Sequence, residues 1–401
     1  MQQPASAEPS DKNEYIVMDA SFFISRRIRF KSGLTMACIA VSFLVMIIAV
    51  GVSSGFRSEI RNGLSVLSGD VQLTPPNLNV LDLSRPIDRS PAYLQYVRKV
   101  EGVRSVSPAV YMAGIVKEGT DIHGVLFKGV EGDMEGVSVP RRLAQLSSLG
   151  EGDRMTAYFV GDKVRARQFT ISSVYDSALE ADDKLVVYAG IADLQRLCGW
   201  TEGQVSAIEI TLDGDHKDEE AIIEATQEIG ALVNAWSEDS DSPVIATSSV
   251  SRYPQLFDWL NLIDFNVLFI LILMTIVAGF NMISGLLIML FENISTIGLL
   301  KSLGMNDRAI SKVFLTSAAV LVLKGMLAGN ALALLFCLVQ DRTHFLKLDP
   351  ENYFVSFVPV EVDVPAVLLA DAAAFVVIML LLLIPTLFIS RVDPAQTVRV
   401  K

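Results

Sequence analysis

The chain has 401 residues, 51% of them hydrophobic, and a formal net charge of −12 at pH 7. Its three histidines and three cysteines are scattered, which excludes a metal-ligand motif and a disulfide-stapled domain. Four segments have the roughly 20 apolar residues that a helix needs to cross a bilayer core. The chain is therefore predicted to be an integral membrane protein.

Residues 1–32 are predicted to be a cytoplasmic tail. Residues 1–14 are polar and carry Pro and Ser, the composition of a disordered segment. Tyr15–Phe30 alternates apolar and basic residues, for which two interpretations stay open. The segment is either a short amphipathic helix along the inner membrane surface or a basic anchor for the first span.

The first span is predicted over residues 33–56. Its apolar stretch is longer than the roughly 7–15 residues of a signal-peptide core, and no A-x-A cleavage site follows it. This segment is therefore interpreted as a membrane helix that is not removed.

Residues 57–256 are predicted to form one large α+β domain. β-Branched runs at Val103–Val110 and Val205–Leu212 indicate strands, whereas Asp218–Val233 has apolar positions at helical spacing. The middle part, about 111–204, is richer in strand and turn signals and is predicted to be an inserted β-rich subdomain.

The remaining chain is predicted to alternate between spans and connections. It comprises a second span with an outward extension (257–291), a cytoplasmic coupling segment (292–312), a third span (313–339), a periplasmic loop (340–363), a fourth span (364–390) and a cytoplasmic tail (391–401). The expected fold is an α-helical membrane protein with four transmembrane helices in a one-plus-three order and a large α+β domain between the first two.

The orientation follows from the positions of the basic residues, because short loops rich in Lys and Arg stay in the cytoplasm. They lie before the first span, between the second and third, and after the fourth: Arg26, Arg27, Arg29, Lys31, Lys301, Arg308, Lys312, Arg391, Arg399 and Lys401. Both termini are therefore predicted to be cytoplasmic and the large domain periplasmic. From Phe56 to Asp258, 19 Lys and Arg stand against 31 Asp and Glu, so this domain carries all of the chain's excess negative charge.

The spans contain glycine pairs and two ionisable residues. Two pairs have the small-xxx-small spacing that lets helices approach closely in lipid, so helical neighbours are expected in this subunit or another: Gly51 with Gly55, and Gly325 with Gly329. Lys324 and Asp371 differ in depth by roughly 12 Å at about 1.5 Å per residue. A direct pair is therefore not expected, and Lys324 is expected to extend its ammonium group to the interface.

No catalytic or nucleotide-binding motif is present. The chain lacks G-x-x-x-x-G-K-[ST] and G-x-S-x-G, and no G-x-G-x-x-G follows a predicted strand. The acidic clusters at Glu180–Asp183 and Asp213–Glu220 lack the spacing of an EF-hand loop and are interpreted as solvated surface. We expect no catalytic residue, cofactor or metal in this chain.

The segment Glu292–Gly304 (ENISTIGLLKSLG) lies between the second and third spans. Its apolar residues fall around a short helix: Ile294, Ile297, Leu299, Leu300 and Leu303. Gly304 is a natural residue for the end of that helix. Since no other segment is seen to cover this apolar face, a docking partner is expected.

This segment resembles the coupling helix of the MacB/FtsX-type ABC permeases, which fits a groove in the ATPase subunit. Further motifs resemble the lipoprotein-releasing permeases LolC and LolE: FNMISGL (Phe280–Leu286), LDPENYFVSFVPVEVD (Leu348–Asp363), SGFRSEI (Ser54–Ile60) and DPAQTVR (Asp393–Arg399). Phe169–Trp200 with Val205–Leu212 is similar to the inserted subdomain of the same family. The chain departs from the family at Phe291–Asn293, where members often carry a more basic stretch.

The resemblance implies a MacB-like periplasmic core with its inserted subdomain, in a protein of the bacterial inner membrane. It implies a non-enzymatic permease subunit that extracts lipoproteins from the outer leaflet and hands them to a LolA-like periplasmic carrier. ATP and Mg would be bound by a LolD-like ATPase, and a second permease subunit would complete a homo- or heterodimer. No nucleic acid is expected as a partner.

Three groups of residues are predicted to carry this function. The ATPase-coupling group is Glu292, Ile294, Ile297, Gly298, Leu299, Leu300, Lys301, Leu303 and Gly304. The lipid or lipoprotein contacts, which alternatively face bulk lipid or a partner subunit, are Val45, Met46, Ala49, Val50, Phe265, Leu268, Phe269 and Ile272. The carrier-docking group is Asp176, Ser177, Ala178, Leu179 and Glu180.

Two other classes of protein remain as alternatives. An FtsX-like or MacB-like permease would transmit motion to cell-wall hydrolases or drive efflux, but FtsX relatives usually have a smaller outer domain and MacB carries its ATPase in the same chain. A membrane-anchored sensor or adhesion protein would leave the segment after Glu292 unexplained.

Overall fold

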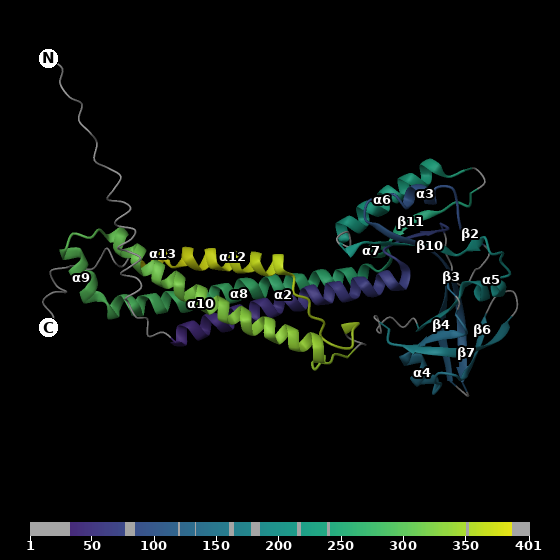
Figure 1. The fold of residues 1–401 in the computed structure, drawn as a ribbon, viewed down its shortest axis with the longest axis horizontal. Coiled ribbons are helices and arrows are strands. Elements are labelled where there is room, and N and C mark those ends of the chain that lie inside the picture. The colour runs from purple at the N-terminus through teal and green to yellow at the C-terminus, as the bar shows by residue number, and fades with distance from the viewer. Residues whose placement is uncertain are drawn as a thin grey trace, which may run out of the picture. The chain divides into compact units, whose positions relative to one another are not determined.

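The computed structural model describes residues 33–76, 85–118, 121–132, 134–159, 164–177, 185–214, 218–238, 241–349 and 353–386. The predicted tails, 1–32 and 391–401, lie outside these residues. The chain divides into two compact units, whose elements are labelled in Figure 1. The helical unit comprises Met1–Gly55, Leu262–His344 and Pro359–Lys401, and the sheet-containing unit comprises Phe56–Asn261 and Phe345–Val358.

Four helices of the described chain are long and apolar enough to cross a membrane. They are α2 (Gly33–Ser68), α8 (Pro254–Glu292), α10 (Asp307–Thr343) and α12 (Val364–Leu381), with α13 (Leu383–Thr386) after the last. The short helix α9 (Ile294–Ser302) connects α8 to α10. Both α2 and α8 continue past the predicted ends of their spans as single helices, and their outer turns are part of the sheet-containing unit.

The helical unit is held together by apolar side chains from α2, α8, α9, α10 and α12. One buried cluster comprises Ile39, Phe43, Met46, Ala278, Met282, Leu286, Met289, Leu290, Ile297, Ile310, Phe314, Ala318, Leu321, Val322, Ala374, Ile378 and Leu382. Side-chain caps start two of the helices: Asn306 accepts from the first backbone N–H groups of α10, and Asp363 accepts from Ala366 N at the start of α12.

The glycine pair on α10 packs against α2. A Cβ atom at Gly325 would lie 2.6 Å from Ile39 Cγ2, and one at Gly329 would lie 2.4 Å from the backbone oxygen of Ala40. Only glycine allows the two backbones to approach this closely. The predicted helical neighbour of this pair is therefore confirmed, and it belongs to the same chain.

The other glycine pair, Gly51 and Gly55 on α2, lies against the segment that precedes α12 as well as against α10. A Cβ atom at Gly55 would lie 2.5 Å from the carbonyl of Pro359, and the backbone N–H of Glu361 donates to Gly51 O (3.0 Å). In the described chain these glycines thus admit an extended segment that precedes α12. A Cβ atom at Gly51 would also lie 3.5 Å from Cys337 Sγ on α10, so this glycine has a helical neighbour in the same chain, whereas Gly55 lies against the segment that precedes α12.

The sheet-containing unit has nine paired strands in the order β11-β1-β10-β3-β4-β8-β5-β7-β6 among its described residues. The strands are β1 (Val71–Thr74), β3 (Val103–Glu118), β4 (Asp121–Val130), β5 (Val137–Pro140), β6 (Arg154–Phe159), β7 (Arg165–Tyr175), β8 (Leu185–Gly190), β10 (Ala207–Leu212) and β11 (Ile245–Ser248). A separate pair joins β2 (Ile87–Asp88) to β9 (Gln204–Val205). Five helices accompany them: α3 (Leu94–Val97), α4 (Arg141–Ser147), α5 (Ile191–Cys198), α6 (Glu219–Trp236) and α7 (Ser249–Arg252).

The long strand β3 belongs to two layers. Its first half, Val103–Ala109, pairs with β10 in an antiparallel sheet with β1 and β11. Its second half, Val110–Glu118, pairs with β4 on one side and in part with β6 on the other. Since β3, β4, β8, β5, β7 and β6 pair in a ring, these strands close into a small barrel. The barrel lies almost entirely within the stretch predicted as the inserted subdomain.

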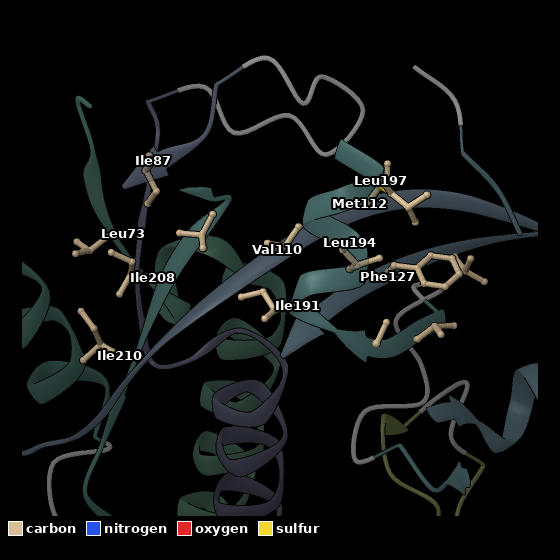
Figure 2. Close-up of a cluster of buried hydrophobic side chains, with 14 of the residues drawn as sticks. Leu73, Ile87, Val110, Met112, Phe127, Ile191, Leu194, Leu197, Ile208 and Ile210 are labelled. Atoms are coloured by element: carbon tan, nitrogen blue, oxygen red, sulfur yellow. The ribbon is translucent and has the colours of Figure 1, made fainter. Parts of the chain in front are cut away.

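A continuous apolar core fills both layers, and Figure 2 shows part of it. Leu73, Ile208 and Ile210 come from β1 and β10, whereas Ile191, Leu194 and Leu197 come from α5, which packs on β3 and β4. Inside the barrel the rings of Phe127, Phe159 and Phe169 contact one another, with centroids 4.9 Å apart for Phe127 and Phe159. Backbone closure and aromatic packing together make this layer compact.

Gly114 on β3 makes room for these rings, and its replacement by valine is expected to destabilise the barrel. A Cβ atom there would lie 2.9 Å from Phe127 Cε2 and 3.1 Å from Phe159 Cε1. Overpacking of this kind costs about 1–3 kcal/mol, which thermal unfolding of the purified protein would report as a Tm lowered by several degrees. Gly124→Val is the control, because a Cβ atom at Gly124 has no neighbour within 4 Å. Equal unfolding temperatures for the two variants would contradict the described packing.

Candidate coupling and lipid-contact sites

The predicted coupling segment forms a corner between α8 and α10, at one end of the helical unit (Figure 1). The chain turns at Asn293, whose N–H donates to Met289 O (3.1 Å) and whose carbonyl accepts from Ile297 N (2.9 Å). Helix α9 then runs for nine residues, and α10 already begins at Asp307. The segment 292–312 therefore holds the end of α8, all of α9 and the first residues of α10.

Gly304 ends α9 in the left-handed conformation, with φ of +87°, as the sequence predicted. Its N–H donates to Lys301 O and the N–H of Met305 donates to Leu300 O, both at 3.0 Å. These two bonds satisfy carbonyls that the last turn of a helix otherwise leaves unpaired. Leu300 and Met305 both pack against the buried cluster of the helical unit, which fixes the turn in place.

The start of α10 is tied to α9 by charge and by a cap. Asn306 Oδ1 accepts from the N–H groups of Arg308 (2.7 Å) and Ala309 (3.2 Å). Lys301 Nζ lies 2.9 Å from Asp307 Oδ1, and its side chain is 11% exposed. Lys301 thus fastens one helix to the next inside the chain. The salt bridge and the cap therefore connect α9 to the start of α10.

The apolar residues of α9 divide into a buried set and an exposed set. Ile297 is 1% exposed in the core of the helical unit, Gly298 is buried, and Leu300 packs against that core. Leu299 and Leu303, in contrast, are 55% and 75% exposed. They are four residues apart and so share one face of the helix. The expectation that the whole apolar face lacks a cover was wrong, because the chain's own bundle covers half of it.

The other predicted coupling residues lie around this exposed pair. Glu292 and Gly304 are exposed at the two ends of the corner, and Ile294 is half-buried. Phe291, in the last turn of α8, is 68% exposed and was absent from the predicted group. The sequence did offer a signal for Phe291: it is an aromatic residue directly before the segment predicted to bind a partner. Aromatic residues are enriched among the residues that dominate protein contacts.

The predicted lipid contacts divide in the same way. On α8, Phe265, Leu268, Phe269 and Ile272 are between 52% and 67% exposed and form an apolar face at helical spacing. On α2, Met46 and Val50 are buried inside the helical unit, while Val45 and Ala49 are half-buried. Met46 and Val50 therefore pack within the bundle and are not on its surface. The α2 and α8 residues do not form one exposed face in this structure.

The ionisable residues of the spans have polar or exposed surroundings. Asp371 is 5% exposed and accepts a hydrogen bond from Asn330 Nδ2 (2.5 Å), which links α12 to α10. Ser53 Oγ donates to Asp264 Oδ1 (2.6 Å), which links α2 to α8. Lys324 lies on the exposed side of α10, and the described residues include no ion pair between it and Asp371. The expectation that these two do not pair is consistent with this placement.

The predicted carrier-docking loop begins where β7 ends. Asp176 is exposed and forms a two-point ion pair with Arg141 at the start of α4, including Nη2 to Oδ2 at 3.0 Å. This hydrogen bonding lowers the pKa of the Asp176 carboxyl. Ser177 follows at the surface, half-buried by its neighbours. Ala178, Leu179 and Glu180 lie outside the described residues.

Comparison with known proteins agrees with the resemblance drawn from the sequence. Residues 268–394 match the family described as FtsX-like permease C-terminal. The chain is 22% identical to the lipoprotein-releasing system transmembrane protein LolC of Xylella fastidiosa, over 93% of this chain and 95% of the relative. It is 21% identical to LolC of Neisseria meningitidis, over 93% and 96%, and 21% identical to LolE of Haemophilus influenzae, over 89% and 91%.

Among solved structures, the periplasmic region of MacB from Actinobacillus actinomycetemcomitans is similar, at 14% identity and a TM-score of 0.30. It covers 46% of this chain and 91% of its own. The resemblance to the FtsX-like permeases and to LolC and LolE is confirmed by the sequence relatives. Four helices of the described chain are long and apolar enough to cross a membrane, which agrees with this similarity to membrane permeases.

Proposed function

From this similarity to FtsX-like permeases, we propose that the chain is the transmembrane subunit of an ABC-type complex that releases lipoproteins from the inner membrane. The complex takes lipoproteins from the outer leaflet and passes them to a periplasmic carrier, and a separate ATPase supplies the energy. The observation that carries this proposal is the similarity to LolC and LolE along about nine tenths of the chain, including both units. That extent favours lipoprotein release over the FtsX-like and MacB-like alternatives.

The physical need for an ATPase follows from the substrate. Moving acyl chains from a bilayer into water costs about 0.8 kcal/mol per CH₂ group, so a triacylated protein does not leave spontaneously. The chain itself contains no P-loop sequence. ATP and Mg are therefore assigned to a partner, which needs a surface of this chain to act upon.

We assign that surface to the exposed side of the α9 corner. Leu299 and Leu303 present two large exposed apolar side chains, and Phe291 and Glu292 are exposed where α8 enters the same corner. The buried side of α9, the Lys301–Asp307 pair and the turn at Gly304 fasten the corner to α8 and α10. A displacement of α9 by the ATPase would thus reach both long helices without being absorbed in a flexible loop.

The acyl chains are assigned to the exposed face of α8. Phe265, Leu268, Phe269 and Ile272 offer a wide apolar stripe that a lipid tail or a second permease subunit would cover. Val45 and Ala49 of α2 join it only if the helices rearrange during the cycle. In this proposal both termini are cytoplasmic, the sheet-containing unit is periplasmic, and the carrier docks beside Asp176 and Ser177.

Reconstitution tests the proposal. The chain, its co-purified ATPase and any second permease subunit are inserted into proteoliposomes with a triacylated lipoprotein, and a soluble carrier is added outside. We expect lipoprotein to move to the soluble carrier only when ATP and Mg are present. Continued ATP hydrolysis with no transfer of lipoprotein to the carrier would overturn the proposal.

A further inference from the structure

The C-terminal end of α2 is seated in a buried polar cluster of the sheet-containing unit. A helix leaves its last four carbonyl groups without partners inside the helix. Here all four have one: Ser65 O accepts from Gly69 N (2.9 Å), Val66 O and Leu67 O accept from Lys128 Nζ (3.0 and 2.9 Å), and Ser68 O accepts from Arg252 Nη1 (3.4 Å). Two cations thus stand at the negative end of the helix dipole, where they are stabilising.

The third N–H group of the Lys128 ammonium donates to Glu209. Its Nζ lies 2.8 Å from Glu209 Oε2, and the two side chains are only 4% and 10% exposed. Glu209 Oε1 accepts from the Tyr111 hydroxyl, which in turn accepts from Gln72 Nε2 (3.1 Å). Burial and the neighbouring carboxylate raise the pKa of Tyr111 well above its ordinary value, so this hydroxyl remains a donor.

The cluster lies where the open sheet passes into the barrel. Gln72 on β1 is opposite Glu209 on β10, in the open sheet. Tyr111 on β3 is opposite Lys128 on β4, in the barrel. Because β3 is shared by both layers, the Lys128–Glu209 pair ties the end of α2 to the sheet and to the barrel at the same time.

A second set of hydrogen bonds connects the end of α2 to the segment that precedes α8. The Asp70 carboxylate, 1% exposed, accepts from Ser65 Oγ (3.0 Å) on α2 and from Leu212 N (2.8 Å) on β10. Its backbone oxygen accepts from Ser249 N (2.8 Å), the first residue of α7. Arg252, in the same short helix, donates to Ser68 O and Thr247 O. The outer end of α2 and the approach to α8 therefore meet at one point.

A buried ion pair of this kind is a weak source of stability, because desolvation of both charges offsets most of their attraction. The ion pair instead favours one arrangement of the surrounding elements, because each buried charge is stable only when its hydrogen-bond partners are in position. An apolar contact would tolerate sliding, whereas Lys128 is held by three acceptors at once.

We infer that Lys128, Glu209 and Tyr111 form a force-transmitting joint that locks the end of α2 to both layers of the sheet-containing unit, so that movement of α2 moves sheet and barrel as one body. These are positioning residues for the transport cycle. The inference rests on the proposed function, because it assigns a path for the motion that the ATPase starts.

The test compares two double variants in the reconstituted complex. Lys128→Met/Glu209→Gln removes both charges of the buried ion pair together, so neither partner is left without the other. Arg89→Met/Glu131→Gln makes the same chemical change at a more exposed ion pair of the same unit, whose side chains are 34% and 47% exposed. The readouts are ATP hydrolysed per lipoprotein released, and hydrogen exchange of backbone amides in residues 60–70 and in β6 and β7.

For the joint variant we expect ATP hydrolysis within about twofold of the unmodified complex and release at least tenfold lower. Exchange should rise in residues 60–70 while β6 and β7 keep their protection, which shows that the barrel is still folded. The control should match the unmodified complex in every readout. Tyr111→Phe removes one hydroxyl and keeps the ring, so the ATP hydrolysed per lipoprotein released should lie between the values of the double variant and the control. This variant replaces the double variant in the test if the double variant does not fold.

The outcomes separate the two proposals. If the unmodified complex releases no lipoprotein, the proposed function fails. If it does, and the joint variants release as much lipoprotein per ATP as the control, the joint alone is overturned. Faster exchange in residues 60–70 without loss of release would equally overturn it.

Discussion

Replacing Leu299 and Leu303 together by glutamate is expected to abolish ATP-dependent release and to separate the ATPase from the chain, while the helical unit stays folded. The two side chains are 55% and 75% exposed, so the substitution leaves the chain's own core intact. At an apolar contact, however, two carboxylates would lose their water without gaining partners, which costs several kcal/mol. A loss of about 4 kcal/mol corresponds to roughly a thousandfold weaker association.

Co-purification of the ATPase and transfer of lipoprotein to the carrier measure this effect. Leu146→Glu is the matched control, since Leu146 is a comparably exposed leucine (46%) on α4 of the other unit. Leu300→Glu is a useful contrast: Leu300 packs against the bundle core, so it should lower the unfolding temperature as well. An intact complex carrying both glutamates would show that the ATPase binds elsewhere.

Replacing Gly329 by leucine is expected to prevent the helical unit from assembling. A Cβ atom at this position would lie 2.4 Å from Ala40 O, 2.9 Å from Phe43 Cβ and 3.1 Å from Leu44 N. Two of these three atoms belong to the backbone of α2, which does not move aside as a flexible side chain would. Since α2 and α10 would have to separate along their length, the cost should exceed the roughly 1–3 kcal/mol of ordinary overpacking.

Size-exclusion chromatography in detergent and thermal unfolding of the eluted protein measure the result. Ala331→Leu adds a side chain of the same size on the exposed side of the same helix and should behave like the unmodified protein. A monodisperse Gly329→Leu protein with an unchanged unfolding temperature would contradict the close contact of α2 and α10.

The spans and the corner were predictable because their signals are local. About 20 consecutive apolar residues require a bilayer or a deep core, and a glycine after a short helical pattern ends it. Gly304 and the pair Gly325 and Gly329 therefore have the roles that the sequence indicated. Asp218–Val233 was likewise predicted as a helix and corresponds to α6, which runs over Glu219–Trp236 with Asp218 as its N-cap residue.

The faces of the spans were not predictable, because a helix that is apolar all round carries no stripe to orient it. Val45 and Met46 are equally apolar in sequence, yet only Met46 lies in the bundle core. The apolar residues of α9 are likewise similar to one another in hydrophobicity. The sequence therefore did not show that Ile297 lies on a covered side of this helix and Leu299 on an exposed side. Packing against distant helices decides these questions.

The joint at the end of α2 was invisible for a different reason. Lys128 and Glu209 are 81 positions apart, and Tyr111 and Glu209 are 98 apart. Each looks like an ordinary surface residue in the sequence. Only the pairing of β10 with β3, and of β3 with β4, brings them together under the helix.

Site-specific crosslinking from the α9 corner tests the central claim most directly. A photoreactive amino acid is placed at position 299 or 303 in the full-length chain in native membranes, and the crosslinked product is identified by mass spectrometry. We predict that a chain with a Walker-motif ATPase sequence is captured from both positions, with Ala331 as a position that captures none. Crosslinks to lipid alone, or to a protein without nucleotide-binding motifs, would contradict the account.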